Sequence, residues 1–232
     1  MRTTLVQQAR SSEYGALLDL TEAWHRAYAE RQGMAYVRVD GAVAHRSWPA
    51  QWDQIQLLAN LMDDGAGLVL WLDADTLVVD PEADLREGLG EGQLAMARHP
   101  GPPAHWNCGV LLARNTPQVR DFLVQTLALG PGEYPWYQQQ VMNRLLARPE
   151  WGHLISRLDD RWNATFGVTE VARPAVVAWH DGQGAASKLA RMEAYLRAPA
   201  RTVSAGGYAG RPLPKPIPEA GPYPRLARGR SP

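Results

Sequence analysis

One stretch indicates the fold of this chain: Gly67-Leu68-Val69-Leu70-Trp71-Leu72-Asp73-Ala74-Asp75-Thr76. Its unbroken apolar run, residues 68–72, predicts a strand that is buried on both faces. Asp73 and Asp75 follow, and on an extended backbone residues two positions apart point to the same side. Ligands of open α/β sheets bind at the carboxyl ends of the strands, so the two acids can face a divalent cation that holds a phosphate. The alternative is a solvated strand end whose acids cap a turn.

Strands and helices alternate on both sides of this stretch. The sequence predicts a strand at 3–7, a helix that is capped by Ser11 or Ser12 and ends at Gly33, a strand at 35–39 and a second helix at 51–63. The inward face expected for the first helix is Tyr14, Leu17, Leu18, Thr21, Trp24 and Tyr28. This order implies right-handed βαβ units, and the predicted fold class is therefore α/β, with a mainly parallel sheet flanked by helices.

The second half of the chain continues this alternation up to a change in composition. Strands are expected at 93–98, 109–113, 155–158 and 175–179, and helices at 117–128, 136–147 and 186–197. Six prolines between residues 212 and 224 then exclude a regular helix or sheet. We predict a single domain over residues 1–198 and a Pro/Gly-rich tail over 199–232, which is either strapped over the domain or disordered.

The composition excludes several classes of protein. The chain has 24 basic and 24 acidic residues, and this balance argues against a nucleic-acid partner. No apolar run of about 18 residues predicts a membrane span, and the first residues lack a signal-peptide core. The single cysteine, Cys108, excludes an internal disulfide. A cytoplasmic location is therefore expected.

Four further stretches place polar side chains or glycines at the expected ends of strands and helices. They are Asn107-Cys108-Gly109-Val110, Trp136-Tyr137-Gln138-Gln139-Gln140, Arg161-Trp162-Asn163, and His180-Asp181-Gly182-Gln183-Gly184 with Lys188 after it. A glycine in such a place lets a ligand approach the backbone.

With these stretches in this order along the sequence, the chain resembles the glycosyltransferase family of yeast α-mannan galactosyl- and mannosyltransferases and plant xyloglucan xylosyltransferases. The matching pieces are Tyr28-Ala29-Glu30-Arg31-Gln32-Gly33, the Trp52 helix and the Asp73-Ala74-Asp75 motif. Asn107-Cys108-Gly109-Val110 is similar to the family's Asn-x-Gly-Val step. Gln138-Gln139-Gln140 is similar to its Glu-Gln-Asp motif, and His180-Asp181-Gly182 to its His-x-x-Gly-type loop. The resemblance covers residues 3–197.

The resemblance implies a GT-A (Rossmann-like) fold, a nucleotide-sugar donor that is expected to be a UDP-hexose or UDP-pentose, and transfer with retention of anomeric configuration. It also implies Mn²⁺ or Mg²⁺ as the cofactor. Asp73 and Asp75 match the metal- and ribose-binding acids, with Asp75 counted as catalytic, and His180 matches the third metal ligand. The donor-binding residues that it implies are Asp73, Asn107, Gly109, Gly182, Gly184 and Lys188. A cation and a lysine would stabilise the negative charge that develops on a diphosphate leaving group.

The sequence departs from the family pattern at two places. Only Gln139 of the Glu-Gln-Asp motif is unchanged, and we place it beside the reacting carbon as a polar stabiliser rather than a nucleophile. The lysine that often follows the helix tryptophan is absent from Trp52-Asp53-Gln54. The donor sugar therefore cannot be inherited from the family, and the acceptor is an unidentified glycan, peptide or small molecule.

Other interpretations stay open. His180 could be a core histidine, Asn107 a turn residue and Gln139 part of a helix surface; Cys108 is expected to be a small buried residue. Trp48, Trp106 and Trp136 could fill the core or form an acceptor platform. A nucleotidyltransferase is an alternative enzyme, although the segment after the first strand, residues 7–12, lacks the glycines of a phosphate loop. A catalytically decayed protein that binds nucleotide-sugars or glycans is the non-enzymatic alternative.

Overall fold

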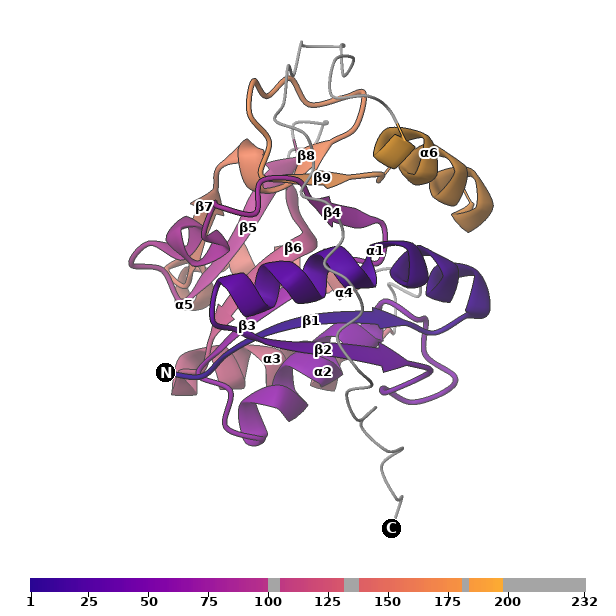
Figure 1. The fold of residues 1–232 in the computed structure, drawn as a ribbon. Helices are drawn as coiled ribbons and strands as arrows, with labels where there is room; N and C mark the ends of the chain where they lie inside the picture. Colours follow the sequence, from indigo (N-terminus) through magenta and orange to yellow (C-terminus); the bar gives the residue numbers. More distant parts are fainter. Residues whose placement is uncertain (100–104, 132–137, 181–183, 198–232) are drawn as a thin grey trace.

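The computed structural model describes residues 1–99, 105–131, 138–180 and 184–197, and it is built on two β-sheets. The main sheet has six strands in the order β2-β1-β3-β6-β5-β7 (Figure 1). Their bounds are β1 (Thr3–Ala9), β2 (Ala35–Asp40), β3 (Leu68–Leu72), β5 (Leu94–His99), β6 (His105–Arg114) and β7 (Ile155–Leu158). Only β6 runs antiparallel to its neighbours, β3 and β5, and the other neighbouring strands are parallel. The predicted mainly parallel sheet is confirmed.

The apolar run of β3 is buried because helices cover both faces of this sheet. Val69 and Trp71 belong to a core cluster with α2 (Trp52–Asp63), α3 (Pro117–Leu129) and α4 (Gln138–Leu146). Leu68, Leu70 and Leu72 belong to a second cluster with α1 (Ser12–Arg31) and the 3₁₀ helix η1 (Leu85–Leu89). Successive residues of a strand face opposite sides, so an unbroken apolar run is what a sheet covered on both faces requires.

The first βαβ unit forms as the sequence predicts. Ser11 caps α1, since its Oγ accepts a hydrogen bond from the backbone N–H of Tyr14. Gly33, with φ +65°, lies just beyond the end of the helix in the left-handed conformation that glycine favours. One detail of the predicted inward face is wrong, because Tyr14 is exposed. Trp24 is half-buried and packs against the core, and Gly15 and His25 lie on the buried face as well.

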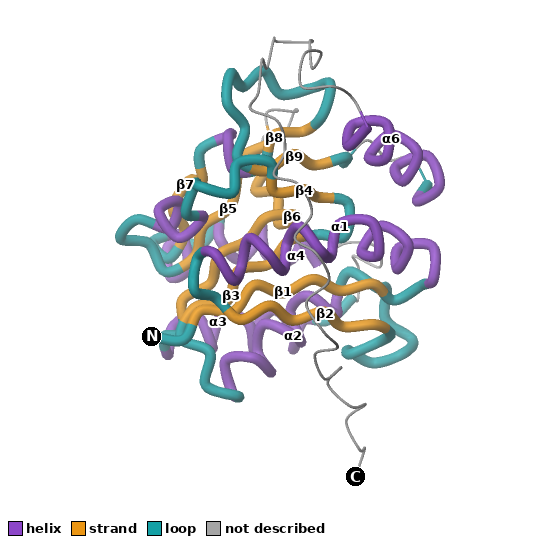
Figure 2. Tube along the Cα trace, in the orientation of Figure 1, coloured by secondary structure: helices purple, strands orange, loops and turns teal. Residues whose placement is uncertain are grey.

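A second, three-stranded sheet lies beside the main one, and most of it is not predictable from local sequence. Its order is β4-β9-β8, from β4 (Thr76–Val78), β9 (Val176–Ala178) and β8 (Ala164–Thr165). β9 pairs antiparallel with β4 and parallel with β8. Helix α6 (Ala185–Arg197) lies next to this sheet and packs against α1 (Figure 2). This sheet brings residues 164–180 to the end of β3.

Most remaining elements match their predicted ranges within a few residues. The strand predicted at 109–113 is longer and begins at His105, and the helix predicted at 136–147 is described from Gln138. The helix α5 (Pro149–Gly152) and the 3₁₀ helices η1 and η2 (Asp160–Trp162) were not predicted. Trp136 and the tail, 199–232, lie outside the described residues. No helix in the described ranges is long and apolar enough to cross a membrane.

A buried polar network ties α1 to both sheets. His25 and Gln7 are fully buried. His25 Nε2 accepts a hydrogen bond from the backbone N–H of Val78 at 3.2 Å, so in the neutral ring Nδ1 carries the proton and donates it to Gln7 Oε1 at 2.7 Å. Gln7 Oε1 also accepts from the Tyr36 hydroxyl, and Gln7 Nε2 donates to the carbonyl of Asp73 at 3.4 Å. Because it is buried, the pKa of His25 is lowered to about 3.

This network predicts a stability change with pH. His25 is neutral in the folded protein, whereas in the unfolded chain it takes up a proton below about pH 6.5. Folding therefore loses about 1.4 kcal/mol per pH unit to this one group as the pH falls from about 6.5 towards about 3. We expect His25→Gln to be less stable than wild type at pH 7 and the gap to narrow towards pH 5, as measured by urea unfolding at each pH.

A control on the same helix separates this effect from general acid destabilisation. Thr21 is buried and its hydroxyl donates to the carbonyl of Leu17, but it does not titrate. Thr21→Ala should lower the free energy of unfolding by a similar amount at every pH. A constant gap between His25→Gln and wild type from pH 7 to pH 5 would contradict the assignment of a buried neutral histidine.

Candidate metal centre

Asp73 and Asp75 lie in the turn that joins β3 to β4. The carbonyl of Asp73 accepts hydrogen bonds from the backbone N–H of Thr76 at 3.1 Å and from its hydroxyl at 2.7 Å. The backbone N–H of Asp73 donates to the carbonyl of Gly109 on the neighbouring strand β6 at 2.8 Å. The predicted position at a strand end is confirmed. The extended backbone that we expected between the two acids is wrong, because a turn orients their side chains.

His180 reaches this turn through the second sheet. The backbone N–H of Trp179, just after β9, donates to the carbonyl of Asp75 at 3.0 Å, so the end of β9 is joined to the turn. One ligand atom from each of Asp73, Asp75 and His180 lies within 4.8 Å of the others. His180 Nδ1 lies 3.8 Å from Asp75 Oδ1. The structure thus brings together the three residues predicted as metal ligands.

Two other side chains are bonded to the carboxylates. The indole N–H of Trp71 donates to Asp73 Oδ1 at 2.6 Å. Lys188, on α6, is 7% exposed and its ammonium donates to Asp75 Oδ2 at 2.6 Å. Lys188 therefore lies beside the acids, as its predicted role near a diphosphate requires, but in this structure it is paired with Asp75.

The electrostatics of the cluster favour a bound cation. Burial, together with the charge of Asp75, raises the pKa of Asp73 above its ordinary value. Burial lowers the pKa of His180, and the imidazole is neutral at pH 7, the form that binds metals. Although burial acts in the opposite direction, the charge of Asp75 raises the pKa of Lys188. A divalent ion would relieve the repulsion between the two carboxylates.

The donor set fits Mn²⁺ or Mg²⁺. Carboxylate oxygens suit hard divalent cations, and an imidazole beside them suits Mn²⁺ in particular. Two oxygens on opposite sides of a Mg²⁺ ion are about 4.2 Å apart. The three side chains, within 4.8 Å of one another, thus need only small rotations to bind one ion together.

Asn107 and Gly109 lie beside His180, and so does Asn163, for which no role was predicted. Asn163 Oδ1 lies 3.1 Å from His180 Nε2, and Asn163 Nδ2 donates to Asn107 Oδ1 at 3.0 Å. Asn107 Oδ1 also accepts from the backbone N–H of Gly109 at 2.8 Å. The sequence contains one feature that could have indicated Asn163, because this polar residue directly follows a short capped turn. No local pattern, however, connects Asn163 to His180.

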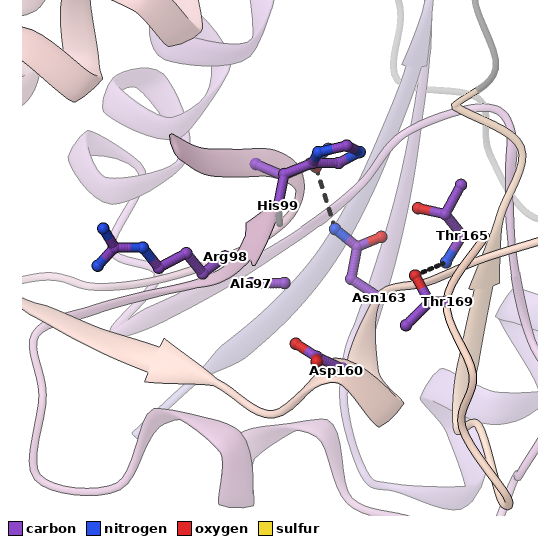
Figure 3. Close-up of a pocket in the computed structure, with 8 residues that line it drawn as sticks. Ala97, Arg98, His99, Asp160, Asn163, Thr165 and Thr169 are labelled. Carbon is purple, nitrogen blue, oxygen red and sulfur yellow. Dashed lines mark hydrogen bonds between the residues drawn. The ribbon is translucent and has the colours of Figure 1, made fainter. Parts of the chain in front are cut away.

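A small pocket of about 30 Å³ opens beside these asparagines (Figure 3). It is lined by Ala97, Arg98, His99, Asn107, Asp160, Asn163, Thr165 and Thr169. The side chains come from the ends of β5 and β6, from η2 and β8, and from the loop after β8. Amide and hydroxyl groups that line a pocket can hydrogen-bond to the hydroxyl groups of a ligand.

The three glutamines of α4 differ in their surroundings. Gln139 Oε1 accepts from the backbone N–H of Cys108 at 2.9 Å, and no contact described in the structure joins Gln139 directly to Asp73, Asp75 or His180. Gln138 is buried, and its amide donates to Gln54 Oε1 at 2.6 Å. Gln140 is exposed. The role predicted for Gln139 beside a reacting carbon stays a prediction.

Several other predicted positions have a simpler structural account. Cys108 is buried, and burial raises the pKa of its thiol, so it is the small buried residue that we expected. Trp48 and Trp106 both pack against the core. The carbonyl of Gly184 accepts hydrogen bonds in the first turn of α6, and its donor-binding role stays a prediction. Gly182 lies outside the described residues.

The fold is shared with solved glycosyltransferases. A glycosyltransferase involved in the glycosylation of the major capsid of PBCV-1 is 14% identical with a TM-score of 0.65, over 84% of this chain and 100% of that one. GlyE of Streptococcus pneumoniae TIGR4 is 15% identical (TM-score 0.53; 84% and 64% of the chains), and the bifunctional WbbM is 12% identical (0.51; 84% and 51%). The chain spans roughly two thirds of GlyE and half of WbbM.

This likeness confirms the predicted GT-A fold class, and at 12–15% identity it shows the fold alone. No protein-family model and no curated protein matches the sequence.

The ion pair between Lys188 and Asp75 predicts how the site responds to metal. In Lys188→Met the acids lose their buried cation, so the metal-free protein should be less stable. Mn²⁺ should bind more tightly, by about tenfold, because the ammonium that pairs with Asp75 no longer repels the ion. Unfolding temperatures with and without Mn²⁺, together with a calorimetric titration, measure both effects.

Arg197→Met is the matched control, because Arg197 is an exposed residue at the end of the same helix that pairs with Glu193. It should leave Mn²⁺ affinity at the wild-type value. Unchanged or weaker Mn²⁺ binding by Lys188→Met would show that Lys188 and the ion do not share Asp75.

Proposed function

We propose that this chain is a metal-dependent glycosyltransferase that moves a sugar from a nucleotide-sugar, expected to be a UDP-hexose or UDP-pentose, to a glycan, peptide or small-molecule acceptor. The observation that carries the proposal is the convergence of Asp73, Asp75 and His180 at the end of β3, in a fold shared with glycosyltransferases. Membership of the yeast mannan and plant xyloglucan family, and transfer with retention, are parts of the proposal that rest on the sequence resemblance.

The arrangement supports the departure of a diphosphate. A Mn²⁺ or Mg²⁺ ion would bind to Asp73, Asp75 and His180 and would supply positive charge to the leaving group. The ammonium of Lys188 donates to Asp75 Oδ2. Once an ion neutralises the two acids, this ammonium can turn to a phosphate oxygen of the donor. Both positive charges are held in place before the reaction, so their stabilising effect requires little reorganisation.

Hydrogen-bonding groups lie next to the metal centre. The small pocket beside Asn107 and Asn163 is also lined by Arg98, His99 and Asp160, and the two asparagines connect it to His180. Its volume of about 30 Å³ admits a single hydroxyl group of a ligand, to which these side chains can hydrogen-bond. Gln139, bonded to Cys108 between Asn107 and Gly109, is the candidate polar stabiliser near the reacting carbon.

Donor binding is the first test. Unfolding temperatures would be measured with UDP-, GDP-, ADP- and TDP-sugars, each with and without Mn²⁺. A ligand at about 100 times its Kd that binds only the folded protein adds about 2.7 kcal/mol of stability. We expect one nucleotide class to stabilise the protein, only with metal. If no nucleotide-sugar raises the unfolding temperature, the proposal is contradicted. If one binds but is neither transferred nor hydrolysed, the result favours a protein that only binds nucleotide-sugars.

The metal assignment predicts a loss of turnover. Asp75→Ala removes one metal ligand and the partner of Lys188, and it should lower sugar transfer or donor hydrolysis by about a hundredfold or more. Asp121→Asn, an exposed change on α3, is the control and should keep wild-type turnover. Full activity of Asp75→Ala in Mn²⁺ would contradict a catalytic metal at this site.

A further inference from the structure

We propose that Asn107 and Asn163 are positioning residues that fix the proton of His180 on Nε2, and thereby present the lone pair of Nδ1 to the ion held by Asp73 and Asp75. This inference rests on the metal site of the proposed function. It assigns Asn107 a task different from the donor contact implied by the resemblance, and it gives Asn163 a role.

The chain of hydrogen bonds begins at a group that can act only as a donor. The backbone N–H of Gly109 can only donate, and it lies 2.8 Å from the terminal atom of Asn107. That atom must therefore be the amide oxygen. The assignment does not depend on a choice between oxygen and nitrogen made for the side chain itself.

The same logic passes through Asn163 to the imidazole. Asn163 approaches the oxygen of Asn107 at 3.0 Å, so the atom that approaches must be its NH₂ group. The other terminal atom of Asn163 is then an oxygen, and it lies 3.1 Å from His180 Nε2. An amide oxygen accepts, so Nε2 must donate, and in a neutral ring Nδ1 is left without a proton.

The orientation of Nδ1 fits this result. It faces Asp75 Oδ1 at 3.8 Å, which is too long for a hydrogen bond. With the proton on Nε2, these two atoms are both acceptors and have no proton to share. Two acceptors that face each other at this distance can both bind one cation between them. Hydrogen bonds that orient a metal-binding histidine commonly act through its other ring nitrogen in this way.

Gly109 makes the arrangement possible because the imidazole lies directly against the backbone of β6. A Cβ at position 109 would be 2.4 Å from His180 Cε1 and 2.7 Å from Nε2, closer than real Cβ contacts come. The Asn-x-Gly step thus serves His180 in two ways. Asn107 anchors the hydrogen-bond chain, and Gly109 leaves the space that the ring occupies.

The protonation of His180 can be measured without metal or nucleotide. Long-range ¹H–¹⁵N correlation spectra of protein with ¹⁵N-labelled histidine distinguish the two neutral forms of the ring, and a His180→Gln sample identifies the signal. We expect wild type to show the proton on Nε2. A proton on Nδ1 in wild type would overturn the proposal, whatever the variants do.

Variants then test the chain itself. Asn163→Ala should give a mixture of the two ring forms and should weaken Mn²⁺ binding by about 10- to 100-fold, measured from the signal of free Mn²⁺ in electron paramagnetic resonance. Asn107→Asp is the matched control, because a carboxylate still accepts from Gly109 and from Asn163, and it should keep the wild-type ring form. Unchanged ring form and Mn²⁺ affinity in Asn163→Ala would overturn the proposal.

A steric variant gives a second route, should Asn163→Ala not fold. Gly109→Ala removes no polar group but displaces the imidazole, so Mn²⁺ affinity should fall to a similar extent. Wild-type affinity would count against the proposal. All these measurements omit the nucleotide-sugar. A failure of sugar transfer would therefore leave their outcome unaffected, and a failure of the positioning chain would leave the donor screen unaffected.

Discussion

The repulsion between two carboxylates at the end of a buried strand is the constraint on which the site depends. Asp73 and Asp75 sit in one tight turn, and Asp75 is 5% exposed, so water cannot fully screen their charges. The protein offsets this cost with the indole N–H of Trp71 on one acid and the ammonium of Lys188 on the other. These two bonds leave room in the site for one more positive charge.

Holding the turn in place requires contacts from several parts of the fold. Its backbone is bonded to Gly109 on β6 and to Trp179 after β9, and Gln7 reaches the carbonyl of Asp73 from β1. Behind Gln7, the neutral ring of His25 joins β1 to β4. The two sheets therefore meet at the acids, and contacts from β1, β6 and the end of β9 hold the turn in addition to the Trp71 indole of the preceding strand β3.

Two glutamines in the stretches that resemble family motifs are connected in space. Gln54, in the Trp52-Asp53-Gln54 stretch, and Gln138, in place of the motif's glutamate, are both buried, and the amide of Gln138 donates to Gln54 Oε1 at 2.6 Å. Gln54 also donates to the carbonyl of Cys108, next to the Asn-x-Gly glycine. A neutral amide pair needs no charge partner in such a buried place. These two glutamines thus pack together beside Cys108, whereas Gln140, in place of the motif's aspartate, is exposed.

Local sequence determined the alternation of strands and helices, the double-sided burial of β3 and the position of the two acids at its end. These features follow from hydrophobic spacing, capping residues and glycines, which act over a few neighbouring residues. The second sheet, the turn geometry of the acids and the chain from Gly109 through the two asparagines to His180 were decided only by tertiary structure. Asn163, which bonds to Asn107, is 56 positions away from it in the sequence, and His180, which is connected to Asn107 through Asn163, is 73 positions away. Such contacts form because separate strands pack side by side, and no local pattern encodes that pairing.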